Sequence, residues 1–265
     1  MNYESKFGKQ LLQCVATAGQ ILRRRLRFLV PALVFIGAGF VTMASPDTFS
    51  AEEQRMALPL FFGVGAVAIL LAIVLVKRSE AVIYENGFVF TRGSKVTELN
   101  FDNVKGISDW TTSIKFYGVI SVGSVREVKI VKQDGEKIAL TDATGFNLQN
   151  YSLPNFDQLA DELGAVITKR LLKDVAKEKI GYVNISFGDQ LEFTGGQFVY
   201  NEDKGRNKIY IPLSKVIGAE IPEDSYWLFL LGPRGQDGKA ERLASIRADK
   251  ALNLGALYRI IEMSK

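Results

Sequence analysis

Two long apolar blocks dominate the first third of the chain. Residues 28–46 and 56–76 carry no charged side chain, and each approaches the ~20 residues that a helix needs to cross ~30 Å of hydrocarbon. Residues 47–55 between them are mostly polar. The pattern predicts two transmembrane helices joined by a short periplasmic loop.

A cleaved signal peptide is the alternative for the first block, because a basic segment precedes it and small residues follow it. About 27 residues precede the block, however, and a second apolar block follows only about nine residues later. Such a leading segment is long for a signal peptide. We therefore favour a membrane helix.

The segment before the first block, residues 1–27, has apolar positions at helical spacing. These positions are Phe7, Leu11, Cys14, Val15, Ala18 and Leu22. The spacing predicts an interfacial helix at the cytoplasmic membrane surface. A frayed tail or a continuation of the first membrane helix is the alternative. Cys14 is then either a small buried apolar residue or a site of acylation.

Beyond Arg78 the apolar positions alternate, as in β-strands, and turns follow at short intervals. Asn86-Gly87 and Asp134-Gly135 are strong hairpin signals. Seven strands are predicted at residues 80–84, 88–92, 95–101, 104–110, 113–121, 125–132 and 136–141. An apolar stripe from Phe156 to Leu171 then predicts a helix that covers a sheet.

The same order of elements recurs after Lys179. Seven further strands are predicted at residues 182–186, 190–194, 197–201, 207–213, 216–221, 226–231 and 240–246. Leu254, Leu257, Tyr258 and Ile261 then share one face of a final helix.

The two series also match in sequence over a short stretch, with an offset of about 110 residues. The corresponding pairs are Phe88 and Phe198, Val89 and Val199, Phe90 and Tyr200, Phe101 and Leu213, and Val104 and Val216. This match predicts an internal duplication. Strand chemistry shared by unrelated segments is the alternative.

The distribution of charge sets the expected orientation in the membrane. The basic residues that flank the two helices are Arg23, Arg24, Arg25, Arg27, Lys77 and Arg78. Basic flanks stay in the cytoplasm, so both termini are expected on that side of a bacterial inner membrane. The formal net charge of +4 combines +5 in residues 1–27, −2 in the loop and +1 in residues 77–265. Because the excess belongs to the membrane flank, we expect no nucleic-acid binding.

The available residue types argue against an enzyme. The sequence has no histidine and a single cysteine, which excludes Ser-His-Asp and Cys-His arrangements, the usual zinc ligand sets and an intrachain disulfide. Acidic residues cluster near Asp102, Asp109, Asp161 and Glu220, at predicted strand ends, turns and helix faces, where solvated acids are ordinary. We predict no catalytic, metal or cofactor site.

Small and aromatic residues supply the candidate contact surfaces. Gly37, Gly39, Gly63, Gly65 and Ala68 allow close approach of the membrane helices. The aromatic candidates for an interaction surface are Trp110, Tyr226 and Trp227. The run "YWLFLL" that begins at Tyr226 is apolar throughout, which predicts a strand buried on both faces or pressed on another subunit.

Seven strands and a helix, with "YENGFVF" followed by "VTELNFDNVKGI", resemble bacterial pleckstrin-homology-like (PH-like) domains found behind one or two membrane helices. Phe101, Asp102, Asn103 and Val104 match the hydrophobic, polar, polar, Val/Ile pattern that ends a strand in these domains. The resemblance implies an α+β fold with two tandem PH-like units, at residues 79–177 and 178–265. Each would be a seven-stranded orthogonal sandwich, or partly open barrel, with a C-terminal helix.

The resemblance also implies a non-enzymatic interaction module. Eukaryotic relatives bind phosphoinositides through a basic first hairpin, whereas the corresponding hairpins here contain Glu85-Asn86-Gly87 and Phe187-Gly188-Asp189. We therefore expect no specific phosphoinositide binding.

The leading hypothesis is a multi-pass inner-membrane protein that presents two cytoplasmic PH-like units for contact with proteins or the membrane surface. It is expected to be a homo-oligomer or a subunit of a membrane complex. A small oligomeric channel, similar to mechanosensitive channels with cytoplasmic β domains, is the alternative because a pore could be lined by the small residues. An enzyme acting on lipid or envelope precursors has only the membrane location in its favour.

Overall fold

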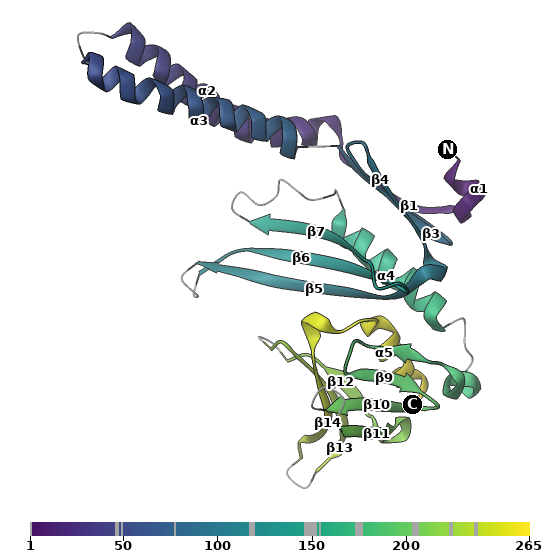
Figure 1. Cartoon of the computed structure of the whole chain (residues 1–265). Coiled ribbons are helices and arrows are strands. Elements are labelled where there is room, and N and C mark those ends of the chain that lie inside the picture. Colours follow the sequence, from purple (N-terminus) through teal and green to yellow (C-terminus); the bar gives the residue numbers. More distant parts are fainter. Residues whose placement is uncertain are drawn as a thin grey trace.

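The structure, a computed structural model, describes the chain except for residues 1, 46–47, 49, 77, 117–119, 146–152, 154, 173–176, 203–206, 223–224 and 236–237. A helical hairpin projects from two β units that lie one beside the other (Figure 1). The protein is therefore an α+β protein, as its sequence pattern predicts.

The helical hairpin consists of α2 (Ala18–Ala44) and α3 (Ala51–Leu75). Each helix starts at a capping box, Thr17 with Gln20 and Ser50 with Glu53, in which the two side chains satisfy backbone N–H groups at the helix start. Both helices begin earlier than their apolar blocks do. The basic cluster before the first block therefore belongs to the helix itself.

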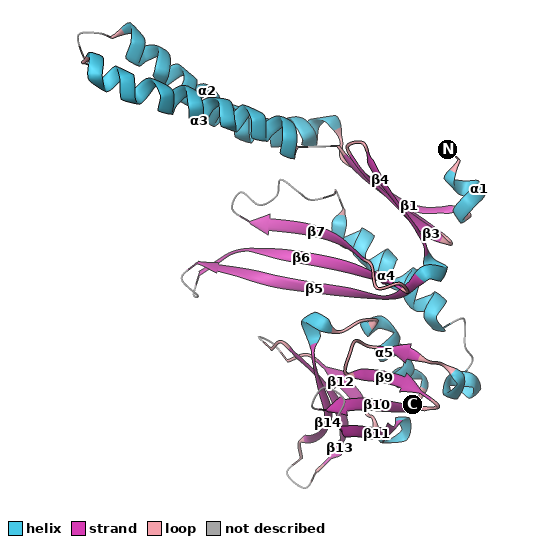
Figure 2. Ribbon diagram, in the orientation of Figure 1, coloured by secondary structure: helices cyan, strands magenta, loops and turns pink. Residues whose placement is uncertain are grey.

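The first β unit contains two antiparallel sheets and the helix α4 that packs on them (Figure 2). One sheet has the order β1-β2-β3-β4 and the other the order β5-β6-β7. The strands are β1 (Gln10–Val15), β2 (Ser79–Tyr84), β3 (Gly87–Arg92), β4 (Lys95–Asn100), β5 (Val104–Phe116), β6 (Ile120–Lys132) and β7 (Lys137–Gly145). Helix α4 (Phe156–Leu172) packs its predicted apolar stripe against the core between the sheets.

The expectation of an interfacial helix in residues 1–27 is wrong. Strand β1 pairs with β2, and Cys14 on its inner face is only 2% exposed within the core of the first unit. A short helix, α1 (Tyr3–Phe7), covers the opposite face of the sheet, where Phe7 packs on Val82 and Val89. A short segment with apolar residues on both faces of a strand can also match the spacing of a helix. Here tertiary packing selected the strand.

The predicted strands 104–110 and 113–121 are also corrected, because β5 runs without a break through Thr111 and Thr112. Its partner β6 starts earlier than predicted, so the two form one long hairpin. The first unit nevertheless has seven described strands, because β1 supplies the seventh.

The second β unit repeats this arrangement, with sheets of order β11-β10-β9-β8 and β12-β13-β14. The strands are β8 (Ile185–Ser186), β9 (Leu191–Thr194), β10 (Gln197–Glu202), β11 (Asn207–Pro212), β12 (Gly218–Glu220), β13 (Trp227–Arg234) and β14 (Ala240–Arg247). Helix α5 (Leu254–Met263) closes the unit and buries its apolar face in the core.

Strand β13 is buried on one face only, which corrects one of the two interpretations of "YWLFLL". Leu228 and Leu230 point into the core, whereas Trp227 on the other face is 44% exposed. Phe229 on that outer face lies under the guanidinium of Arg242, 4.1 Å from the ring centroid. This cation–π contact shields an apolar side chain from water.

The residue pairs that match in sequence occupy equivalent places in the two units. Phe88 in β3 and Phe198 in β10 are both fully buried. Asn155 and Asn253, which precede the C-terminal helices of the two units, both have a φ of 57°. The left-handed conformation is unusual for a residue with a side chain, so its recurrence at the same place supports duplication.

The position of the helical hairpin follows from this equivalence. In the second unit, strands β8 and β9 are joined by the short turn 187–190 and pair antiparallel. In the first unit, the corresponding strands β1 and β2 also pair antiparallel, but residues 16–78 separate them. The two long helices are thus an insertion in the first turn of the first unit.

Candidate functional site

The base of the helical hairpin is held directly by the first sheet. The Ala16 N–H donates a hydrogen bond of 3.0 Å to the Ser79 carbonyl, immediately beyond the paired residues Val15 and Glu80. Only a few residues therefore separate each long helix from a hydrogen-bonded strand. The orientation of the helices is coupled to the sheet.

The predicted basic flanks lie at this base. Arg23 and Arg25 are exposed on α2, and Arg78 is exposed just before β2. Arg24 and Arg27 also belong to α2, but their side chains, like the whole of Lys77, lie outside the described residues. The four arginines lie within residues 23–27, near the start of α2 at the base of the hairpin.

The predicted small residues of the long helices divide into two groups. A Cβ at Gly39 would lie 3.0 Å from the ring of Phe62, and one at Gly65 would lie 2.6 Å from Ile36. Gly39 and Gly65 therefore allow α2 and α3 to pack closely, and Ala68 is half-buried in α3. By contrast, a Cβ at Gly37 or Gly63 would meet nothing within 4 Å. These two glycines leave flat surface on the outside of the hairpin.

We expect Gly65→Val to loosen the helical hairpin, because its side chain would overlap Ile36. Overpacking of this kind costs about 1–3 kcal/mol. Thermal unfolding of the detergent-solubilised chain should show a lower midpoint. Ala66→Val, at the neighbouring exposed position of α3, is the matched control and should leave the midpoint unchanged; equal shifts for both variants would contradict this packing.

The junction between the two β units is organised by Asn253, which is 1% exposed. Its side-chain Oδ1 accepts a 2.9 Å hydrogen bond from the Ile107 N–H of β5, and its Nδ2 donates a 3.0 Å bond to the Ser186 carbonyl of β8. Its backbone N–H donates to the Ile107 carbonyl at 2.6 Å. A Cβ at Gly106 would lie 2.6 Å from the Asn253 amide. One asparagine thus links both units.

Two of the predicted aromatic residues also lie at this junction. Trp110 of β5 packs against the core of the second unit and lies 5.9 Å from the Tyr226 ring, centroid to centroid. The contact is within one chain, so Trp110 is an intramolecular contact residue. Trp227 is left on an accessible face.

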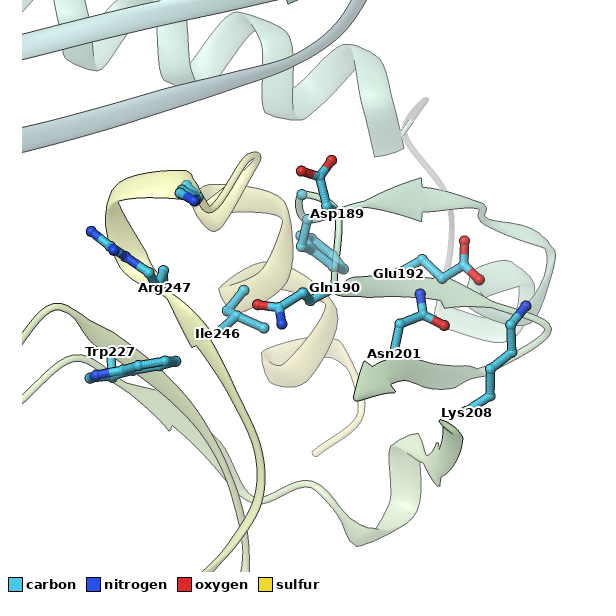
Figure 3. Close-up of a pocket in the computed structure, with 11 residues that line it drawn as sticks. Asp189, Gln190, Glu192, Asn201, Lys208, Trp227, Ile246 and Arg247 are labelled. Carbon is cyan, nitrogen blue, oxygen red and sulfur yellow. The ribbon is translucent and has the colours of Figure 1, made fainter. Parts of the chain in front are cut away.

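A pocket of about 760 Å³ opens beside Trp227 at the mouth of the second unit, between its two sheets. Figure 3 shows Trp227 and Arg247 on one wall, Asn201 and Lys208 on the opposite wall, and Ile246 between them. A volume of this size is within the range of small-molecule sites. The mouth combines an aromatic face with polar and charged groups.

Some polar groups of the mouth have hydrogen-bond partners and others do not. Arg247 donates two hydrogen bonds to Asp249, at 2.9 and 2.8 Å, and these bonds raise the pKa of the guanidinium. The Oδ1 atom of Asn201 is buried and has no hydrogen-bond partner among the described residues. A buried acceptor without a partner is costly, so a ligand that donates a hydrogen bond there would be favoured.

Most of the predicted acid clusters form ion pairs that hold the first unit together. Arg126 of β6 is bound by Asp109, Asp157 and Asp161, and the hydrogen bonds that its guanidinium donates to Asp109 are the main reason why its pKa is raised. Asp102 is bound by Arg170. The residues that the structure describes contain no group of three or more acids, cysteines or histidines placed to bind a metal ion.

Cys14 is a core residue of the first unit. Burial raises the pKa of its thiol, and the Sγ atom lies 4.0 Å from the Asn155 carbonyl. A thiol enclosed in this way is a small apolar side chain.

Sequence reasoning missed Asn253 and the pocket at the mouth. The available signal for Asn253 was an asparagine directly before a predicted helix, which is common at helix starts. The pocket is lined by residues from strands and turns far apart in the chain, so no local pattern marks it.

Comparisons with known proteins give a family but no activity. A search of curated proteins finds no match. Among solved structures, the chain is similar to one described as "Structure of the Spt16D Pob3N heterodimer", with 16% sequence identity and a TM-score of 0.21, over 64% of this chain and 86% of that chain. Residues 2–175, from α1 through the helical hairpin to α4, match the family described as "Family of unknown function (DUF6585)". The protein belongs to the DUF6585 family.

Proposed function

We propose that this protein is a non-enzymatic integral protein of a bacterial inner membrane. Its helical hairpin anchors two PH-like β units at the cytoplasmic surface, where they contact proteins or the membrane as part of a homo-oligomer or membrane complex. The proposal rests chiefly on the insertion of the hairpin between the paired strands β1 and β2. Because these strands pair, the N-terminal segment and both β units lie on the same side of any membrane that the helices cross.

The surface of the two long helices supports a membrane location. Both are long and apolar enough to cross a bilayer, and the share of their most apolar segment that is buried in the protein is only 18% for α2 and 11% for α3. A core helix of a soluble protein would be mostly buried. Leu33, Val34 and Leu60 are examples of large apolar side chains that are exposed here, and hydrocarbon is the solvent that suits them.

The arrangement of the β units supports the PH-like assignment. Each unit has a four-stranded sheet, a three-stranded sheet and a C-terminal helix that fills the space between them. The acids of the first unit that sequence singled out, Asp102, Asp109 and Asp161, are engaged in ion pairs with Arg170 and Arg126. These features favour a binding module over an enzyme.

The outer faces of the helical hairpin support an assembly of several copies. Gly37 and Gly63 have open space beside them, and small residues of this kind allow helices of neighbouring subunits to approach closely. Native mass spectrometry of the protein extracted from its membrane should show a complex larger than one chain. A strictly single-chain species without a partner would contradict this part of the proposal.

The orientation can be tested with single cysteines, because the natural Cys14 is enclosed. In a Cys14→Ala background, Thr48→Cys between α2 and α3 should react with a membrane-impermeant maleimide in intact spheroplasts. Lys95→Cys on β4, which is exposed in the structure, should react only after the membrane is permeabilised. Labelling of Lys95→Cys in intact spheroplasts would overturn the proposed orientation.

A further inference from the structure

A second hollow, about 500 Å³ in volume, lies between the two β units. Its lining comes from β5, β6 and β7 of the first unit and from the 187–190 turn and the 3₁₀ turn η5 (Ala248–Lys250) of the second. We call it the junction groove. It shares Asp189 and Lys250 with the pocket at the mouth of the second unit, so the two hollows meet at this turn.

Lysines outnumber acids along the junction groove. Its charged residues are Lys105, Lys129, Lys137, Lys250, Asp189 and Asp249. Lys129 is paired with Glu127 at 2.5 Å, and Asp249 is held by Arg247. Within the described part of the chain, the other three lysines form no ion pair, and Asp189 is the only remaining acid of the lining. The groove therefore carries an uncompensated positive charge.

The walls of the groove are rigid where the two units meet. The 187–190 turn packs tightly on η5, since a Cβ at Gly188 would lie 2.9 Å from the Lys250 carbonyl oxygen. Asn253 follows η5 closely in the chain, and its hydrogen bonds to Ile107 and Ser186 fix β5 beside β8. Lys105 of one unit and Lys250 of the other are thus presented by backbones that the fold holds in place.

The chemistry of the groove selects the class of ligand. Lysine ammonium groups are compact point charges that bind phosphate oxygens from several directions. Like charges gathered on two walls repel one another, and a ligand with more than one negative charge relieves this repulsion. The volume is within the 300–1,000 Å³ typical of small-molecule sites and is large enough for a phosphate or diphosphate group with part of the molecule that carries it.

We propose that the junction groove binds a phosphate-type anion through Lys105, Lys137 and Lys250. The phosphate belongs either to a soluble metabolite or to a lipid headgroup, which share this chemistry. The proposal goes beyond the anchoring function and does not depend on the identity of any protein partner. Because the three lysines come from both units, the bound anion would also strengthen the junction between them.

The test uses the full chain in nanodiscs of zwitterionic lipid, with inorganic pyrophosphate as the probe in isothermal titration calorimetry. We expect measurable binding to the wild-type chain. Lys105→Gln combined with Lys250→Gln should weaken it at least tenfold, whereas Asp189→Asn should tighten it several-fold because a repulsive charge is removed. Lys95→Gln combined with Lys215→Gln makes the same change in net charge at exposed sites outside the groove and should leave the affinity unchanged.

Two results would overturn the proposal: no binding of pyrophosphate to the wild-type chain, or an equal loss in the control and groove variants. Native mass spectrometry of protein extracted from membranes rich in anionic lipid distinguishes the two sources. Retention of a lipid by the wild-type chain but not by the groove variant identifies a headgroup. Retention of a small phosphorylated compound with the same dependence identifies a soluble ligand.

Discussion

Replacing the two long helices by a tight turn should yield a soluble protein that keeps both β units. The change joins Ala16 to Ser79 through the dipeptide Asn-Gly, which favours a two-residue hairpin turn. The register already suits such a turn, because the Ala16 N–H donates to the Ser79 carbonyl. The second unit supplies the precedent, since β8 and β9 are joined by a short turn.

The matched comparison is a chain that begins at Ser79 and therefore lacks β1. Its first sheet would lose the strand that pairs with β2, and with it Cys14 and Phe7, which are almost fully buried. Burial of Phe7 alone contributes about 1.5–3 kcal/mol, and the lost pairing of β1 with β2 adds to it, which together is a large part of the 5–15 kcal/mol stability of a typical domain. We expect this chain to aggregate or to unfold at a much lower urea concentration.

Soluble expression, size-exclusion chromatography and urea unfolding followed by tryptophan fluorescence distinguish the two chains. Equal stability of the chains with and without β1 would contradict the place of residues 10–15 in the first sheet. Failure of the shortened chain to fold, while the full chain folds in detergent, would show that the helices are more than an insertion.

Asn253→Ala is expected to uncouple the two β units. The Ile107 N–H and the Ser186 carbonyl would lose their side-chain partners, and each buried polar group left unpaired costs about 1–3 kcal/mol. Alanine would also be strained at the φ of 57°, which adds roughly 1–2 kcal/mol. The sum is on the order of 3–8 kcal/mol.

Urea unfolding of the full chain in detergent micelles measures the effect of this change, and we expect two separate transitions in place of one. Asn253→Gly removes the same side-chain hydrogen bonds, but glycine is not strained at positive φ. Its loss of stability should therefore be smaller than that of Asn253→Ala by the strain energy of alanine. Asn207→Ala, at an exposed asparagine of β11, is the matched control and should change the stability by less than about 0.5 kcal/mol. A similarly small change for Asn253→Ala would show that the units are held together by other contacts.

Local patterns predicted most of the elements, because each depended on residues close in sequence. The hairpin expected at Asn86-Gly87 joins β2 to β3, with Gly87 as the first residue of β3, and the α4 stripe from Phe156 onward is buried as expected. The prediction failed where two segments far apart in sequence interact. Residues 10–15 have no neighbour in sequence with which to pair, so their partner β2, about 65 residues later, could not be read from the local pattern.

The candidate sites show the same division. The basic flanks and the small residues of the long helices were predicted from composition alone, but their sequence could not separate Gly65, which packs against Ile36, from Gly63, which faces outward. That difference depends on how α2 and α3 turn toward each other. Trp110 was expected on an interaction surface, and the structure shows that it contacts the second unit of its own chain.

The sequence by itself determined two apolar helices, a change to alternating strands and a repeated order of elements, because hydrophobic periodicity and turn residues act over short distances. Only the tertiary structure decided that β1 completes the first sheet, that the helical hairpin is inserted in a turn, and that Asn253 joins the two units. The physical reason is that strand pairing and buried hydrogen bonds satisfy groups brought together from distant parts of the chain, and no local preference encodes which groups will meet.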